Sequence, residues 1–592
     1  MRGNLGMRGW SRSYRHAVGL AIALVLLGAG GADATQKFGP LELSGNLQSQ
    51  NLVRTPDIDE FHFIQQRNTM RFRVDWDWFQ NGKLIDRFEL PWIKSSKLFL
   101  LYRGVYDSVY DYEPTLRERD FRGRKPGRAA ERDLNDLSNG AKDALKFENQ
   151  LREAYVDLKF ADIPLSLRLG KQQIIWGEAD NFRMLDRANP LDVSWHYVME
   201  IPPPSFGWDD LRIPLWMVKG LWDIGSIWKM SNVFAEAYWN PGDWRPVKVG
   251  YLPRPWGLRI PNPLYNREDG AFFAPFTGIE RLMKGTALFK QGDYSRNPVE
   301  NSQVGVRASG MFENGLQVGV HYFYQRWSGD DGTPFAPVRG IAPDTEGQIR
   351  TQQLVSRGTL PVEYITPYIH TVGLSANYFE GNWTQTIFRV ETVYDFGIPM
   401  LDRDKETTFA PLLPGTTRKD YWKGMIAFDR PTWIRSLNKK TTFFITGQWF
   451  VHHIMHNEDT LATALDLPTA GSRGRPFCGS DKFTPCNDPN GNGNFRDDVR
   501  SWEMLMTLVA FTFYKGGSVV PLAGIIYDPV NSHSLYPFLN LQWVVTPNFI
   551  VDISERMFIP GQSDVQKGVF DPWLLGTQRG RTETGVRFTY QF

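Results

Sequence analysis

The stretch TETGVRFTYQF, residues 582–592, stands at the carboxyl end of the sequence and alternates apolar with polar residues. Side chains alternate between the two faces of an extended strand. One face of this stretch is apolar, and it carries Val586, Phe588, Tyr590 and Phe592. The opposite face is polar, and it carries Arg587, Thr589 and Gln591. The pattern predicts an amphipathic β-strand whose apolar face ends at an aromatic carboxyl-terminal residue.

Segments with the same alternation recur along the chain. The clearest is MRFRVDWDW, residues 70–78, where charged and large apolar residues alternate and Asn81-Gly82 follows as a tight-turn signal. The other candidates lie at 41–53, 97–107, 151–160, 165–175, 211–222, 232–239, 302–312, 316–325, 370–379, 383–396, 421–430, 440–452, 501–514, 518–528, 535–545 and 548–558. Most are close to the length of about 9–11 residues that a tilted membrane strand needs.

The connections between these segments sort by length. Short ones such as 313–315 and 546–548 alternate with long ones such as 240–301 and 453–500. This parity is typical of barrels with short periplasmic turns and long extracellular loops. The sequence therefore predicts an all-β, transmembrane antiparallel β-barrel of about 16–18 strands. Its aromatic last residue resembles the terminal Phe of Gram-negative outer-membrane barrels, which the barrel-assembly machinery is expected to read.

The amino terminus has the features of a secretory signal. Four arginines precede the apolar run 17–27, and Ala32-Asp33-Ala34 offers a cleavage site. We expect residues 1–34 to be removed and residues 35–592 to form a single outer-membrane barrel domain. The alternative, a membrane anchor, would need a longer apolar run. With 67 basic and 65 acidic residues, the chain lacks the basic excess typical of nucleic-acid partners.

The polar faces of the strands would line the lumen of such a barrel. The candidates for lumen or gate residues are Arg71, Arg73, Asp75, Asp77, Arg168, Lys171, Glu178, Arg307, Arg389, Glu391 and Arg556. Both signs of charge are present. The lining therefore predicts a water-filled or plugged interior, without simple selectivity for anions or cations.

Residues 169–192, LGKQQIIWGEADNFRMLDRANPLD, depart from the strand pattern. They begin as a strand and then turn polar, and a short helix is expected over 178–186. The triplets Gly170-Lys171-Gln172 and Trp176-Gly177-Glu178, followed by Asn189-Pro190-x-Asp192, resemble the recurring feature of an uncharacterised, domain-of-unknown-function family of proteobacterial outer-membrane proteins. The resemblance implies a barrel that moves hydrophobic or lipid-like compounds in concert with an inner-membrane exporter.

Glu178 is the candidate gate residue of this segment. It follows a Trp-Gly bend, and we expect it to fold inward and pair with a lumenal arginine, which would form a constriction. The alternative is a loop that covers the mouth of the barrel and only stabilises it.

One long connection contains two further candidate sites. Cys478 and Cys486 are expected to form a disulfide after export, the alternative being free thiols. The segment DPNGNGNFRDD resembles a calcium loop, but Val499 stands where such a loop has its bidentate Glu. Its candidate calcium ligands are Asp488, Asn490, Asn492, Asn494, Asp497 and Asp498. The alternative is a polar loop rich in Gly and Asn that binds no metal.

The run HHIMHNED brings His452, His453 and His456 close to Glu458 and Asp459. A metal site there would need a helix, but the pattern predicts a strand that passes into a loop. No motif for acyl transfer, zinc hydrolysis or nucleotide binding occurs, so we do not expect an enzyme. A third hypothesis is a barrel lipase or protease, because such enzymes can carry a Ser/His pair without a local sequence motif.

Besides this third possibility, the sequence supports two functional hypotheses. The first is a porin or transport protein for an unidentified solute, embedded in outer-membrane lipid. The second is a plugged, surface-binding or structural barrel whose extracellular loops bind a partner or calcium.

Overall fold

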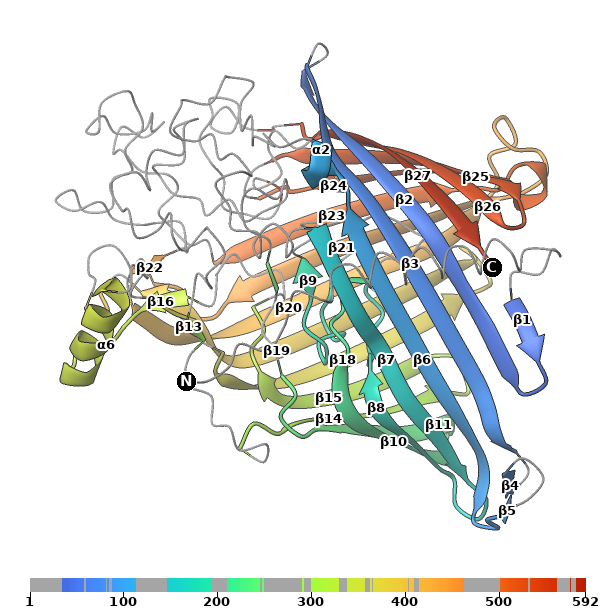
Figure 1. Ribbon diagram of the computed structural model, residues 1–592, viewed down its shortest axis with the longest axis horizontal. Coiled ribbons are helices and arrows are strands. Elements are labelled where there is room, and N and C mark those ends of the chain that lie inside the picture. The colour runs from blue at the N-terminus through green and yellow to red at the C-terminus, as the bar shows by residue number, and fades with distance from the viewer. Residues whose placement is uncertain are drawn as a thin grey trace, which may run out of the picture.

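The computed structural model describes residues 35–592 apart from 58–59, 81, 85–87, 113–145, 181, 194–209, 245–247, 250–289, 292–299, 330–337, 357–361, 365, 403, 409–414, 459, 463–500, 531–532, 560, 562–574 and 576–581. Within this part of the chain, eighteen tilted antiparallel strands form one closed barrel (Figure 1). Every predicted strand segment matches one of them. The strands are β2 (Leu41–Asp57), β3 (Glu60–Gln80), β6 (Ile93–Asp107), β7 (Phe147–Phe160), β8 (Leu165–Gln172), β10 (Leu215–Ile227), β11 (Met230–Asn240), β14 (Gln303–Phe312), β15 (Gln317–Arg326), β18 (Tyr368–Glu380), β19 (Thr386–Asp402), β20 (Gly415–Thr432), β21 (Phe443–Ile454), β23 (Trp502–Phe511), β24 (Val519–Tyr527), β25 (Leu535–Thr546), β26 (Phe549–Arg556) and β27 (Glu583–Gln591).

The seam of the barrel joins the last strand to the first. The β27–β2 ladder runs from Asn46 opposite Gln591 to Arg54 opposite Glu583. Beyond it, Gly45 and Phe592 exchange two backbone hydrogen bonds of 2.8 and 3.0 Å. A Cβ at Gly45 would lie 2.6 Å from the Phe592 ring, so the absence of a side chain lets the terminal aromatic residue pack at the seam. The predicted closing strand and its two faces are confirmed.

The remaining elements are short. They are β1 (Thr35–Phe38), β4 (Lys83–Leu84), β5 (Phe88–Glu89), β9 (Asp192–Val193), β12 (Lys248–Val249), β13 (Lys290–Gln291), β16 (Val338–Gly340), β17 (Val362–Tyr364), β22 (Leu461–Ala462), α2 (Val109–Tyr112), α6 (Thr345–Ser356) and the 3₁₀ turn η4 (Lys515–Gly517). Helix α6 lies beside one end of the barrel (Figure 1). In the described part of the chain, no helix is long and apolar enough to cross a membrane.

The outer face of the barrel is an apolar belt. Val320 opposes Leu374 across β15 and β18, and their exposed fractions are 54% and 49%. Ile426 opposes Trp449 across β20 and β21, with exposed fractions of 56% and 43%. A closed barrel satisfies its backbone hydrogen bonds internally, so such a surface suits a hydrocarbon solvent.

The connections sort by length between the two ends of the barrel. At the end where β27 finishes, the links 161–164, 228–229, 313–316, 381–385 and 547–548 are short, while 81–92 and 433–442 are somewhat longer. At the opposite end the connections 108–146, 173–214, 241–302, 327–367 and 455–501 are long. The hairpin link 58–59 and the link 528–534 are short exceptions at that end.

The inner face has two different walls. From β2 to β7 it is polar and charged, with buried residues such as Gln48, Arg71 and Arg103. From β23 to β25 it carries an apolar patch of Leu505, Val509, Leu522, Ile526, Tyr536 and Phe538. The polar residues on the inner face of these strands are Glu503, Thr507, Asn540 and Gln542. Strand β24 is apolar on both faces, in contrast to the expected alternation. This apolar patch, which we call the apolar inner wall, was not predicted.

Candidate functional site

The connection between β8 and β10 folds against the inner face of the barrel. We call residues 173–193 the strap and residues 210–214 the return segment. The expected helix over 178–186 is wrong, because the described residues of the strap contain no helix. Gly177 has a φ of +107°, and several backbone N–H groups of the strap donate to a side chain of β19 instead of to the strap's own carbonyls.

Asn189 staples the base of the strap. Its side-chain oxygen accepts a hydrogen bond of 2.8 Å from the Ile174 backbone. Its amide nitrogen donates to the carbonyls of Gln172 (3.1 Å) and Ile213 (2.9 Å). Asn189 is fully buried, so one side chain joins the start of the strap, its end and the return segment.

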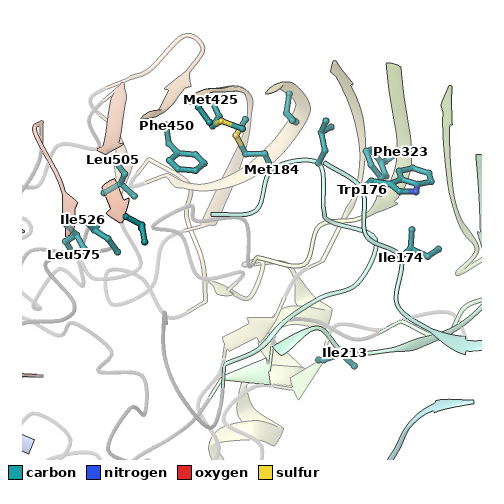
Figure 2. Packing of buried hydrophobic residues seen from close by; sticks show 14 of the residues in the cluster. Ile174, Trp176, Met184, Ile213, Phe323, Met425, Phe450, Leu505, Ile526 and Leu575 are labelled. Atoms are coloured by element: carbon teal, nitrogen blue, oxygen red, sulfur yellow. The ribbon is translucent and has the colours of Figure 1, made fainter. Parts of the chain in front are cut away.

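Apolar side chains of the strap pack on the barrel wall. The ring of Trp176 lies 5.4 Å from that of Tyr238 on β11 and 5.2 Å from that of Phe323 on β15. Figure 2 shows Trp176 beside Phe323, Met184 near Met425 and Phe450, and Leu505, Ile526 and Leu575 as a third group. The apolar cluster therefore continues from the strap to the apolar inner wall.

Glu391 on β19 forms the first clamp on the strap. Its carboxylate accepts hydrogen bonds from the backbone N–H groups of Glu178, Ala179 (3.1 Å) and Leu185 (3.3 Å). A Cβ at Gly177 would lie 2.6 Å from the carboxylate oxygen of Glu391. The glycine therefore admits both the positive φ and the close approach of Glu391.

Two arginine contacts flank this clamp. Arg389 donates to the carbonyl of Glu178 and pairs with Asp180 at 2.6 Å, and Asp180 also accepts a bond of 2.9 Å from Gln448. Arg187 of the strap pairs with Asp395. Asp395 is buried and also lies 3.2 Å from the ammonium group of Lys423.

Asp210 forms a second clamp at the opposite wall. It pairs with Arg71 of β3 and lies 3.7 Å from Arg103 of β6. Burial favours a higher pKa for this carboxyl, but Arg71, Arg103 and Arg152 outweigh burial and hold the pKa of Asp210 far below its ordinary value of 3.8. The clamp therefore keeps its full strength above that value and weakens only as the pH falls below it.

The return segment is joined to both the wall and the strap. Arg152 of β7 donates a bond of 2.6 Å to the carbonyl of Arg212. Arg212 in turn pairs with Asp186 of the strap at 2.6 Å. Strap and return segment thus form one unit, held between the β3–β7 wall and the β18–β21 wall.

Glu178 does not form the expected ion pair. Its carboxylate accepts a bond of 3.4 Å from Asn377, and the strap carboxylate that pairs with a lumenal arginine is Asp180. Glu178 instead borders a polar cavity of about 50 Å³ together with Arg307, His321 and Asn377. The Trp-Gly bend presents both the backbone N–H and the side chain of Glu178 to the wall, where they contact Glu391 and Asn377.

The other predicted lumen residues occupy varied places. Arg73 and Asp75 pair at 2.5 Å, Arg168 pairs with Asp157 at 2.7 Å, and Arg307 pairs with Glu236 at 2.6 Å. Arg556 is buried on the inner face, and Asp77 is half-buried. Lys171 is different, because it opposes the exposed Trp216 on the outer face and donates to the Leu151 carbonyl. It is therefore not a lumen residue.

The described histidines do not converge on a metal. His452 faces inward, 3.2 Å from Glu503, while His453 stacks on Trp502 with ring centres 4.1 Å apart. Across the described ranges, no group of three or more His, Cys, Asp or Glu side chains is placed to hold a metal ion. The predicted leader, Asp459, the pair Cys478 and Cys486, and the calcium loop 488–498 lie outside the described residues.

Replacement of Asn189 by Ala is expected to loosen the base of the strap. The variant would leave one buried N–H and two buried carbonyls without this partner, at a cost of about 1–3 kcal/mol for each unsatisfied group. Hydrogen exchange of the peptide that covers 173–190 should accelerate in the folded barrel. Asn382→Ala, in an exposed short turn, is the matched control and should leave this exchange unchanged. Equal exchange in the two variants would contradict the stapling role.

Residues 16–512 match the model of a family described as a protein of unknown function, DUF1302. The chain belongs to this family. No curated protein matches the DUF1302 chain. Among solved structures, it is similar to OccK8 (OprE) of Pseudomonas aeruginosa, with a TM-score of 0.40, 7% identity, and 93% of this chain and 97% of that chain covered.

Two further solved structures are similar to the DUF1302 chain. OccAB2 of Acinetobacter baumannii has a TM-score of 0.39 and 9% identity, and the match covers 93% of this chain and 99% of that chain. OmpF of Salmonella typhi has a TM-score of 0.34 and 9% identity, with 93% and 97% covered. These likenesses are weak.

Proposed function

We propose that this protein is an outer-membrane transport channel for hydrophobic or lipid-like compounds, with the strap as the element that restricts its lumen. The observation that carries the proposal is the apolar inner wall of β23–β25. Lumenal faces of large barrels are ordinarily polar because they contact water. An apolar inner wall next to a charged one offers a path along which a hydrocarbon stays out of water.

The strap is the proposed gate of this path. Its apolar cluster is continuous with the apolar wall, and its two clamps are built from ion pairs and hydrogen bonds. Competition for either clamp would move the strap without unfolding the barrel. We propose that the residues from Gly170 to Asp192 that resemble the proteobacterial family feature are there to build this strap.

The cellular setting follows from the same proposal. A signal peptide over 1–34 would export the chain, and the barrel-assembly machinery would insert residues 35–592 as one domain into outer-membrane lipid. The end where β27 finishes would face the periplasm, and the long connections would face outward. An inner-membrane exporter would exchange the compound with the periplasmic mouth.

A plugged surface-binding or structural barrel is the second candidate function. The two clamps favour it, because together they hold the strap against much of the inner wall. In that case the long connections would bind partners, and the proposed disulfide between Cys478 and Cys486 and the proposed calcium loop would shape one of them. We do not propose an enzymatic activity for either barrel.

Transfer of a hydrophobic probe between liposomes tests the proposed function. Leu522→Gln places an amide on the apolar inner wall, and transfer of a pyrene-labelled alkane is expected to fall about tenfold, since burying an unpaired amide costs about 1–3 kcal/mol. Leu508→Gln, on the outer face of β23, is the matched control. Both variants are folded if their migration in gel electrophoresis still changes when the sample is heated.

The outcomes separate the two candidates. A loss of transfer in Leu522→Gln alone supports transport along the apolar wall. Transfer no faster than in protein-free liposomes, already with the unsubstituted protein, would instead support the plugged barrel.

A further inference from the structure

A groove of about 480 Å³ crosses the outer face of strands β23–β27. Leu539, Leu541 and Ile553 line it, and their exposed fractions are 50%, 41% and 47%. These side chains belong to the apolar belt, so the groove opens toward the bilayer and not toward the lumen.

The strand register explains the shape of the groove. One row of directly opposed, outward-facing residues runs across five strands: Ala510, Ala523, Leu539, Glu555 and Thr584. Because the side chains of the two alanines at one end are small, the surface is hollowed there. Glu555 and Thr584 lie at the other end of the row. Pro521, Leu541 and Ile553 form the next row and complete an apolar floor.

Along its own chain segment, Glu555 lies between the exposed apolar residues Ile553 and Ile559 of the outer face. The aromatic level of Trp543 and Phe588 is four residues away along the strands, which corresponds to about 13 Å. In the other direction the apolar Ile559, beyond the end of β26, is 45% exposed. Glu555 accepts a hydrogen bond from the hydroxyl of Thr584. A carboxylate facing hydrocarbon at this depth is costly, which marks it as a functional candidate.

We propose that this groove binds a lipophilic molecule that carries a hydroxyl group and is taken up from the bilayer. The hydrocarbon part lies over the alanines and the apolar floor, and the hydroxyl donates a hydrogen bond to Glu555. A neutral donor fits better than an ammonium group, because a permanent charge would have to be brought deep into the belt.

The site goes beyond the proposed transport function, because binding there requires no conduction through the lumen. The inner-wall residues Leu522 and Asn540 also border the groove, so it lies directly behind the apolar inner wall. If the transfer experiment fails, the proposal of a binding groove still stands. If the photolabelling experiment fails, the proposal of a transport channel still stands.

Photolabelling of the full barrel in lipid nanodiscs tests the proposal. The probe is an octadecanol with a diazirine in mid-chain, and its methyl ether is the matched probe that accepts but does not donate a hydrogen bond. One hydrogen bond corresponds to a preference of about two- to tenfold, so the alcohol should label peptides of β23–β27 more strongly than the ether by that factor.

Three variants sharpen the test. Ala523→Trp fills the groove and should remove the labelling, while Ala237→Trp, on the exposed outer face of β11, should leave it intact. Glu555→Leu should reduce labelling by the alcohol to the level of the ether. Equal labelling by alcohol and ether in the unsubstituted protein would overturn the proposal, and so would unchanged labelling in a folded Ala523→Trp barrel.

Discussion

Replacement of Asp210 by Asn is expected to release the return segment from the β3–β7 wall. The substitution keeps the volume of the side chain but removes the negative charge that Arg71, Arg103 and Arg152 share. Removing one partner of a buried ion pair costs about 3–5 kcal/mol, because the remaining charges stay buried. Hydrogen exchange of the peptide over 210–217 should therefore accelerate strongly in a barrel that is still folded.

The strands hold the three arginines whether or not Asp210 is charged, so the barrel itself is expected to survive. Asp162→Asn, in the exposed turn between β7 and β8, is the matched control and should have no such effect. Unchanged exchange of the return segment in Asp210→Asn would show that this ion pair does not hold it.

Replacement of Glu391 by Ala is expected to loosen the strap on the opposite wall, where the ion pairs of Arg389 with Asp180 and of Arg187 with Asp395 remain. Three backbone N–H groups of the strap would lose their acceptor, each at a cost of about 1–3 kcal/mol if it stays buried. The loosened strap should then become cleavable by added protease in a barrel that resists unfolding. Glu391→Gln keeps one acceptor oxygen and should show an intermediate effect.

Glu313→Ala, in an exposed turn, controls for the loss of a carboxylate elsewhere. If Glu391→Ala and Glu313→Ala gave the same protease resistance, Glu391 would not be a clamp. We expect protease resistance to increase from Glu391→Ala to Glu391→Gln to the unsubstituted protein. This order would distinguish a hydrogen-bonding role of Glu391 from a general loss of stability.

The strands could be predicted from the sequence because their outer positions contact a single kind of solvent. In a stretch such as 70–78 the period of two is nearly complete, and the turn signal fixes its end. Strand β24 breaks the rule, since both of its faces are apolar. Its non-alternating sequence SVVPLAGIIYD, residues 518–528, is the signal from which an apolar inner wall was predictable.

The strap could be located from the sequence but its chemistry could not. The interruption of the strand pattern after Gln172 marks the right segment. The side chains that hold it come from strands far away in the sequence, such as Glu391 on β19, and their partners are backbone N–H groups that no residue pattern reveals. For the same reason the sequence predicts an ion pair between Glu178 and a lumenal arginine. In the structure Asp180 forms that ion pair, and the backbone N–H of Glu178 binds Glu391.

Asp210 was missed because it lies in the connection and its partners lie on β3, β6 and β7. The inward-facing Arg71, Arg103 and Arg152 were a usable signal, because buried guanidinium groups on neighbouring strands require a carboxylate from elsewhere. Only the strand register shows that these arginines are neighbours.

Single-channel recording in planar bilayers shows whether a strap held by two clamps restricts the lumen of a transport barrel. We expect small or rare conductance steps for the unsubstituted protein and steps several-fold larger for the Asp210→Asn/Glu391→Ala double variant. Identical recordings from the two proteins, with the strap shown by protease to be released in the double variant, would contradict this restriction of the lumen.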